Sequence, residues 1–265
     1  MIFHKILHMK ITIKIILLFN IFFLEAQENL QYSLIINYDI YYNTEIPNTK
    51  KGSLFISDKL NKSLFIYGKN KDKTINEDVE NNNLKTIASE SVRFNYFNSI
   101  NDSLFSIDKI FNNEYIIVEN AKNLNWILTS DTKKLNNLLV KKALLKFRGR
   151  NYIAWYSEDY PLKFGPWKFN NLPGLILEIY DETNRYRWVV NSIQKNKEKS
   201  SINIKEVFLN TKKINIRDYV NLRYNLKTNL VNESKLPRGT TVNRRKIKRN
   251  GIELIFEWEE EIKEN

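Results

Sequence analysis

The chain has 265 residues, of which 42% are hydrophobic and 13% aromatic, a content that supports a sizeable core and excludes disorder as the main state. It contains no cysteine, and its two histidines, His4 and His8, lie in an amino-terminal segment that we expect to be removed. Without imidazole or thiol, the remaining chain cannot form Ser-His-Asp or Cys-His nucleophiles and lacks the usual ligands of zinc and copper. We therefore expect no metal site and no cofactor.

Residues 1–26 have the features of a secretory signal. Three lysines precede an apolar run at 15–24, and the run ends close to the small residue Ala26. A basic start, an apolar core of about ten residues and a small residue at its end are typical of a cleaved signal peptide, and the run is too short to span a bilayer. The sequence predicts cleavage after Ala26. Residues 27–265 would then form a single exported domain, periplasmic or secreted, without a transmembrane segment.

The formal net charge of +12 raises the question of an anionic partner. The lysines are spread over the length together with many asparagines and isoleucines, which is what AT-rich coding produces whatever the ligand. Nucleic-acid binding in the cytoplasm also conflicts with export, so we expect no nucleic-acid partner. The basic segment at 231–250 has two interpretations, a docking site for an anionic polymer or a solvated loop before a final element.

The first half of the mature chain predicts an antiparallel meander. Residues 31–42 form a strand in this interpretation, and 52–57 and 63–67 form a hairpin. The polar stretch at 70–85 is expected to be an exposed loop. Short apolar runs then recur at meander spacing, at 92–97, 103–107, 115–118 and 126–129.

The centre of the chain predicts a second hairpin. Residues 139–147 alternate, with Ala143 and Leu145 on one face, which is the period of a half-buried strand. Residues 148–151 contain a glycine and read as the turn, because glycine supplies the positive φ that a tight hairpin needs. The returning strand is expected at 152–156.

Residues 157–174 contain three prolines and cannot sustain a strand ladder. They predict an ordered loop packed by its own aromatic side chains. Pro173 and Gly174 fit the second and third positions of a type II turn, which places Gly174 at positive φ. A strand buried on both faces is expected at 175–180, and another strand at 185–190.

The carboxy-terminal part has a mixed pattern. A strand is expected at 202–208, and residues 215–229 have the near-helical spacing of an α-helix capped by Asn215, with Asp218 in its first turn. Residues 252–258 alternate, which predicts a return to the sheet.

Four short motifs resemble the signature of a known family. They are Asn-Leu-Pro-Gly-Leu-Ile at 171–176, Gly-Pro-Trp-Lys-Phe at 165–169, Phe-Arg-Gly-Arg at 147–150 and Ala-Trp-Tyr at 154–156. This block is similar to the GLPGLI family, a set of exported proteins of Gram-negative Bacteroidota without an established function. Asn171 stands where the family has its first glycine. Asparagine tolerates a left-handed conformation best after glycine, so the loop shape can survive.

The resemblance carries implications for partners. Genes resembling this family are often found beside outer-membrane receptor systems, which implies an accessory role toward an envelope protein or ligand. The similarity is specific over roughly residues 125–193 and looser elsewhere.

Carboxylates are the strong acid–base groups that remain, and a hydrolase would pair two of them as glycosidases do. Glu158 and Asp159 read as solvated turn residues. Glu178 lies in the buried strand and is expected to pair with Arg148 or Arg150 as a structural contact.

The tryptophans Trp155, Trp167 and Trp188 have two interpretations. They could line a ligand groove for sugar rings or acyl chains, or they could fill the core, which is the commoner use.

Together these patterns predict a mainly β (α+β) fold, with a twisted antiparallel sheet, one or two helices near the carboxy-terminal end, and a half-barrel shape as one form of it. The half-barrel is an analogy to periplasmic lipoprotein carriers at the level of fold alone. The leading hypothesis is a non-catalytic envelope protein that binds a ligand or partner through residues 155–174. The alternatives are a carboxylate-dependent hydrolase acting on envelope material and an electrostatic binder of acidic polymer that would use residues 238–249. The candidate binding residues are Arg148, Arg150, Trp155, Tyr156, Pro166, Trp167, Phe169, Leu172, Pro173 and Gly174.

Overall fold

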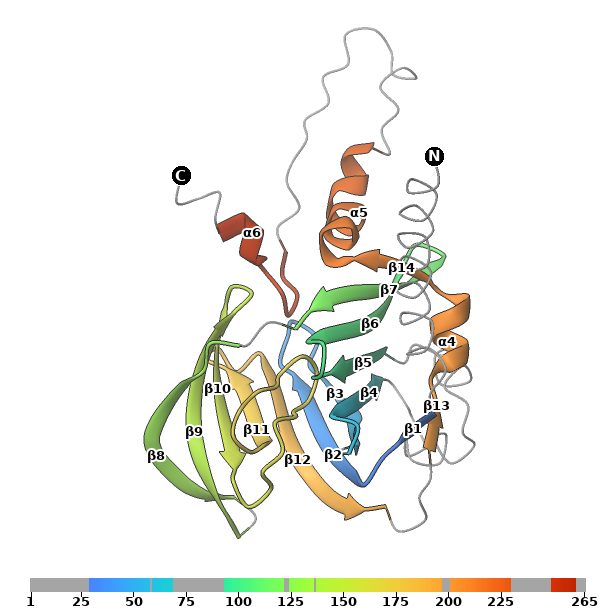
Figure 1. The fold of residues 1–265 in the computed structure, drawn as a ribbon. Coiled ribbons are helices and arrows are strands. Elements are labelled where there is room, and N and C mark those ends of the chain that lie inside the picture. The colour runs from blue at the N-terminus through green and yellow to red at the C-terminus, as the bar shows by residue number, and fades with distance from the viewer. Residues whose placement is uncertain are drawn as a thin grey trace, which may run out of the picture.

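The computed structural model describes residues 29–57, 59–68, 93–121, 124–135, 137–196, 201–229 and 249–260. The export signal predicted at 1–26, the polar stretch at 70–85 and all but the last two residues of the basic segment at 231–250 lie outside the described residues. Within them, one large twisted sheet of twelve strands carries the fold and does not close into a barrel (Figure 1). The predicted mainly β fold class is confirmed.

The sheet has the strand order β14-β7-β6-β5-β4-β3-β2-β12-β11-β10-β9-β8. Its strands are β2 (Leu34–Tyr42), β3 (Asn48–Ser57), β4 (Lys62–Gly68), β5 (Arg93–Asn98), β6 (Ser103–Ile110), β7 (Asn113–Asn120), β8 (Ile127–Leu135), β9 (Leu138–Phe147), β10 (Arg150–Ser157), β11 (Leu175–Asp181), β12 (Tyr186–Lys195) and β14 (Lys212–Asn215). Outside it are the pair β1 (Asn29–Gln31) and β13 (Ser201–Asn203) and the helices α4 (Lys205–Asn210), α5 (Ile216–Asn229) and α6 (Glu257–Glu260). All neighbours in the large sheet are antiparallel except β14 and β7.

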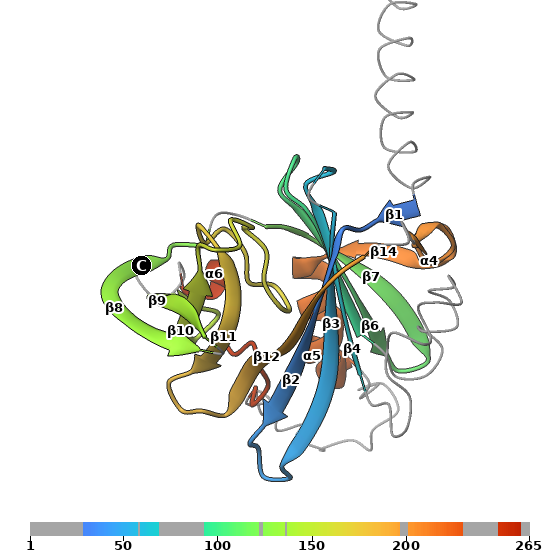
Figure 2. The same cartoon turned by 90° about the horizontal axis from the view of Figure 1, so that it is seen from below.

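The sheet has two arms that meet where β2 pairs with β12, from Tyr42 opposite Tyr186 to Leu34 opposite Lys195. The arm from β12 to β8 curves away from the arm from β2 to β7, and the connection between β10 and β11 lies between them (Figures 1 and 2). This connection is the proline-rich stretch singled out in the sequence. It therefore occupies the inner side of the bend.

Each face of the sheet has its own core. On the inner face, Ile36, Tyr38 and Ile40 of β2 are fully buried together with residues of β9 to β12 and the β10–β11 connection. On the outer face, Phe55 of β3 packs in a second cluster that is covered by β1, β13 and α4. The alternation of a strand accounts for this division, because successive side chains point to opposite faces.

Aromatic contacts hold the β10–β11 connection, together with one isolated antiparallel bridge between Phe164 and Asn170. The rings of Trp167 and Trp188 stack with centroids 6.1 Å apart, and Phe169 packs edge-on against Tyr152 at 4.8 Å. Directly after the connection, at the start of β11, the carbonyl of Ile176 accepts a hydrogen bond of 2.7 Å from the hydroxyl of Tyr38. The connection is thus part of the inner core.

Several local predictions are confirmed. β9 and β10 form a hairpin whose turn residues Arg148 and Gly149 have φ of 49° and 78°, the left-handed pair typical of a two-residue turn. Asn215 caps α5, since its side-chain oxygen accepts the backbone N–H of Asp218 at 2.8 Å. β11 is buried on both faces, with only Tyr180 partly exposed.

Two predicted strands are wrong. Residues 202–208 form the short strand β13 and then α4, because Ile204, Val207 and Phe208 have helical spacing and bury one face. Residues 252–256 do not join the sheet, and α6 begins at Glu257.

The prediction that Gly174 has a positive φ in a type II turn is also wrong. Gly149 is the one described glycine at positive φ, whereas the left-handed residues of the β10–β11 connection are Trp167 at 55° and Asn171 at 67°. The type II turn is therefore not present, and the tolerance expected of Asn171 is the feature that the loop uses. Gly174 is required by close approach, since a Cβ there would lie 2.2 Å from the carbonyl oxygen of Ser157.

This contact makes a stability prediction. Gly174→Ala should lower the free energy of unfolding by about 1–3 kcal/mol, because the backbone of β10 would have to move to admit a methyl group. Gly251→Ala is the matched control, since nothing lies within 4 Å of a Cβ there, and it should change stability by no more than about 0.5 kcal/mol. Urea denaturation measures both. Equal midpoints for the two variants would show that the close approach is not a constraint.

Candidate functional site

The turn of the β9–β10 hairpin places a charged side chain inside the protein. The side chain of Arg148 is only 6% exposed. Its guanidinium donates to Glu119 of β7 at 2.7 Å and to Glu257 of α6 at 3.1 Å, and it also pairs with Glu253. One side chain therefore joins the hairpin to a strand of the other arm, to the carboxy-terminal segment, residues 249–256, and to α6.

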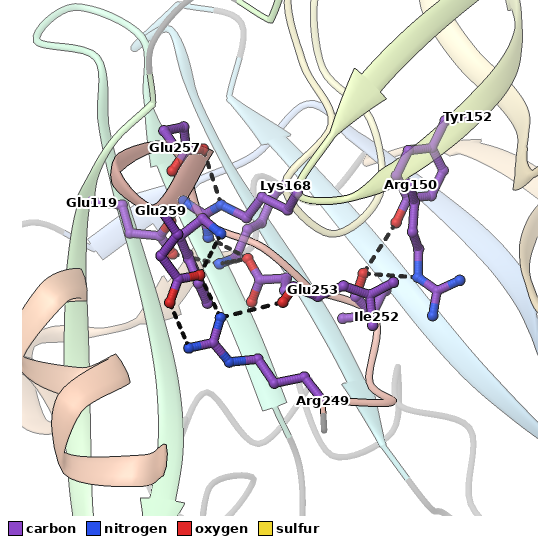
Figure 3. Close-up of polar contacts among 12 residues, drawn as sticks. Glu119, Arg150, Tyr152, Lys168, Arg249, Ile252, Glu253, Glu257 and Glu259 are labelled. Carbon is purple, nitrogen blue, oxygen red and sulfur yellow. Dashed lines mark hydrogen bonds and ion pairs between the residues drawn. The ribbon is translucent and has the colours of Figure 1, made fainter. Parts of the chain in front are cut away.

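A second buried cation comes from the β10–β11 connection. The ammonium of Lys168 lies 2.5 Å from Glu119 and 2.8 Å from Glu253, and its side chain is also 6% exposed. Both carboxylates are thus shared by Lys168 and Arg148; Figure 3 shows Lys168 between Glu119 and Glu253. We call Glu119, Arg148, Lys168, Glu253 and Glu257 the ion network.

The ion network fixes the charge states of Glu253 and Arg148. Burial acts to raise the pKa of Glu253, but the positive charges of Lys168 and Arg148 outweigh it and lower this pKa to about 2. Burial acts to lower the pKa of Arg148, and Glu253, Glu119 and Glu257 reverse this and raise it above the ordinary arginine value. Glu253 and Arg148 are both ionised at neutral pH.

The second arginine of the turn region binds backbone. Arg150 donates to the carbonyls of Gly251 at 2.7 Å and Ile252 at 3.1 Å, and its remaining nitrogen pairs with Asp181 at 3.0 Å. Asp181 is itself buried and accepts the backbone N–H of Tyr186 at 2.7 Å. Arg150 is therefore held in a fixed orientation toward the carboxy-terminal segment (Figure 3).

A cavity of about 640 Å³ lies beside the ion network. Its walls come from β6, β7, β9, the β10–β11 connection and the starts of α5 and α6. Apolar side chains such as Leu145 and Trp258 form part of the lining, and Glu119, Arg148 and Lys168 contribute charge to it. The cavity thus combines an apolar surface with buried ionised groups.

The structure separates the ten candidate binding residues. Arg148 lines the cavity, Arg150 binds the carboxy-terminal segment, and Trp155 is half-buried with the ammonium of Lys133 4.2 Å from its ring. Pro173 is exposed. The other six are buried, namely Tyr156, Pro166, Trp167, Phe169, Leu172 and Gly174.

Of the three tryptophans, Trp155 is half-buried and the other two are buried. Trp188 and Trp167 are 1% and 7% exposed, so core packing is their observed use.

The predicted partners of Glu178 are wrong. Glu178 pairs with Lys133 at 2.6 Å and Arg187 at 2.5 Å, and not with Arg148 or Arg150. Strand register gives the reason. Glu178 stands opposite Trp155 in β10, and Trp155 and Arg150 are an odd number of positions apart, so their side chains point to opposite faces.

Sequence reasoning missed the acidic half of the ion network. Glu253 and Glu257 were part of a run interpreted as a strand, although an acid at 253 between apolar residues was a signal for a paired charge; Glu257 is exposed. Lys168 stood inside a quoted motif but was not selected. Glu119 gave no local signal, because its partners lie far away in sequence.

Two searches of the described residues gave negative results. No group of three or more histidine, cysteine, aspartate or glutamate side chains is placed to hold a metal ion there. None of the described helices has the length and apolar character needed to cross a membrane.

Comparison with known proteins identifies similar folds only. No protein-family model matches the chain, and no curated protein matches it. PNGF-II, solved in space groups P21 and C2, matches with TM-scores of 0.50 and 0.51 at 19% and 18% identity, over 72% of this chain and 33% and 32% of that chain. This chain spans about a third of the length of PNGF-II, and the likeness shows the fold alone. An outer membrane lipoprotein-sorting protein domain from Vibrio parahaemolyticus matches with a TM-score of 0.30 at 9% identity, over 66% of this chain and 89% of that chain. This likeness is too weak to support an argument.

The lowered pKa of Glu253 makes a pH prediction. Its folded pKa of about 2 lies below the unfolded value of 4.5, so its contribution to stability is complete above pH 4.5 and is lost as the pH falls toward 2. Glu253→Gln should therefore flatten the fall of the urea midpoint between pH 4.5 and 2, while it destabilises the protein at pH 7 by about 3–5 kcal/mol through the uncompensated cations. Glu114→Gln, at an exposed position, should keep the wild-type slope. A slope for Glu253→Gln equal to that of the wild type would contradict the ion network.

Proposed function

We propose that this chain is an exported protein of the cell envelope that binds a ligand or partner at the cavity beside the ion network, without transforming it. The main observation in support of this proposal is the cavity itself. Its volume of about 640 Å³ falls within the range of small-molecule sites, which combine apolar walls with a few placed polar groups.

The rigidity of the site supports binding. Glu119, Arg148 and Lys168 each have their charges compensated inside the protein, so the polar part of the wall is formed before any ligand arrives. A preorganised wall lowers the entropic cost of binding.

The state of the carboxylates favours binding over the hydrolase alternative. A general acid near neutral pH needs a raised pKa, whereas the pKa of Glu253 is lowered and Glu119 accepts from two cations. Glu158 is about half exposed and pairs with Lys141 at 2.7 Å. Within the described residues, these contacts favour structural roles for the acids.

The β10–β11 connection then contributes to binding indirectly. Its aromatic side chains Phe164, Trp167 and Phe169 are buried, and Lys168 and Asn170 are its residues in the cavity wall. We infer that the buried rings of this connection support the cavity wall and do not contact the partner themselves. Membership of the GLPGLI family, export, and an accessory role beside an outer-membrane receptor system belong to the same proposal and rest on the sequence.

The proposal is tested by blocking the cavity. Asn120 and Asn125 are exposed and line it, so Asn120→Trp with Asn125→Trp should fill the entrance and leave the core intact. Protein isolated from the envelope of its own cells is analysed by mass spectrometry for small molecules and proteins that co-purify. We expect a species that accompanies the wild type and is reduced at least tenfold with the blocked variant.

Asn113→Trp is the matched control, because Asn113 is exposed at the opposite end of the same strand, β7. It should retain the co-purifying species. The same recovery from all three proteins, or none from any of them, would contradict the proposal.

A further inference from the structure

The carboxy-terminal segment, residues 249–256, lies on the β9–β10 turn without joining the sheet. Its contact with the turn is close, since the backbone N–H of Leu254 donates to the carbonyl of Arg148 at 2.9 Å and a Cβ on Gly149 would lie 3.0 Å from Leu254. The segment therefore packs on a surface that is formed by the β9–β10 hairpin.

Side chains bind the backbone of this segment. Arg150 donates to the carbonyls of Gly251 and Ile252, and the hydroxyl of Tyr152 reaches the carbonyl of Ile252 at 3.4 Å. These contacts recognise main-chain carbonyls and do not depend on which side chains the segment carries. A surface of this kind can receive any peptide of suitable shape.

Two side chains of the segment are recognised individually. Glu253 is bound by Arg148 and Lys168. Phe256 is 1% exposed, and the guanidinium of Arg148 lies 4.7 Å from the centroid of its ring. The surface thus reads an acid followed, three residues later, by an aromatic.

The receiving surface is oriented independently of the segment. Asp181 holds Arg150 at 3.0 Å, the ring of Tyr186 lies under the Arg150 guanidinium at 4.7 Å, and Glu119 holds both Arg148 and Lys168. None of these supports comes from residues 249–256. Removing the segment would leave three directed cations in place, and such preorganisation favours a replacement.

Charge complementarity identifies the chemistry of that replacement. Glu253 pairs with both Arg148 and Lys168, and Glu257, directly after the segment, also pairs with Arg148. We propose that this surface is a docking site for an acidic, aromatic peptide of the pattern Glu-x-x-Phe supplied by a partner protein, and that the carboxy-terminal segment occupies it in cis. This inference rests on the proposed function and deepens it, because it names the chemistry of the partner.

Occupation in cis has a consequence for affinity. The segment and the receiving surface belong to the same chain, so their association is intramolecular and does not depend on the protein concentration. A peptide added from outside must compete with it. The wild type should therefore bind such a peptide more weakly than a variant whose segment is loosened.

The test uses a fluorescein-labelled peptide with the sequence of residues 249–260 and the full chain. Glu253→Gln with Phe256→Ala removes both recognised side chains from the segment and keeps every residue of the receiving surface. Fluorescence anisotropy should show at least about tenfold tighter binding to this variant than to the wild type, with affinity falling as salt increases. Adding Arg150→Gln should reduce the affinity at least about tenfold.

A peptide of the same composition in scrambled order is the control and should bind at least about tenfold more weakly. If the double variant does not unfold cooperatively, Leu254→Ser, at a half-buried position on the turn, loosens the segment instead. A folded loosened variant that fails to bind the peptide, or that binds the scrambled peptide equally, would overturn the proposal. So would dimerisation of the wild type at micromolar concentration by exchange of this segment, since a second copy would then be the occupant.

The outcome separates this inference from the proposed function. Peptide binding is measured on purified protein, whereas cavity blocking is measured on what the envelope supplies. Loss of the peptide result alone would overturn the docking site and leave the cavity assignment standing.

Discussion

A buried guanidinium must be surrounded by acceptors, and Arg148 meets this requirement by drawing separate parts of the chain to one point. Its partners come from β7, from residues 249–256 and from α6, and Lys168 of the β10–β11 connection shares two of them. Desolvation makes such a network costly, and removing one member leaves an uncompensated charge inside the protein. The network therefore specifies how the two arms of the sheet, the connection and the carboxy-terminal segment meet, and the arrangement of the inner face depends on it.

The cavity follows from the same arrangement. Charged side chains that are fully paired cannot collapse into the space beside them, so Glu119, Arg148 and Lys168 hold part of its wall open while Leu145 and Trp258 give it apolar surface. The buried aromatics of the β10–β11 connection support Lys168 from behind. The same residues thus stabilise the fold and form the site. A motif rich in proline, glycine and aromatic residues can therefore be important for binding although its rings do not contact the ligand.

The sequence was sufficient for features that depend on neighbours in the chain. The β9–β10 hairpin, the two-sided burial of β11 and the Asn215 cap follow from period, turn chemistry and capping, and all three are present. It was insufficient where the cause is distant. Gly174 is constrained by the backbone of Ser157 and not by its own φ, and Glu178 selects partners according to register. The run at 252–256 alternates as a strand would. The side chain of Arg150, however, binds the carbonyls of Gly251 and Ile252 in place of a neighbouring strand, and no local pattern could show that.

Amide hydrogen exchange on Arg148→Met tests most directly whether the inner face depends on the ion network. The account predicts that protection is lost together at Leu254, which donates to the carbonyl of Arg148, and at Asn171, which donates to Lys163 within the β10–β11 connection, while the β3–β4 ladder keeps its rates. Arg185→Met removes a more exposed pair with Glu45 and should leave both amides protected. Loss of protection confined to Leu254, with Asn171 unchanged, would contradict the central role of Arg148.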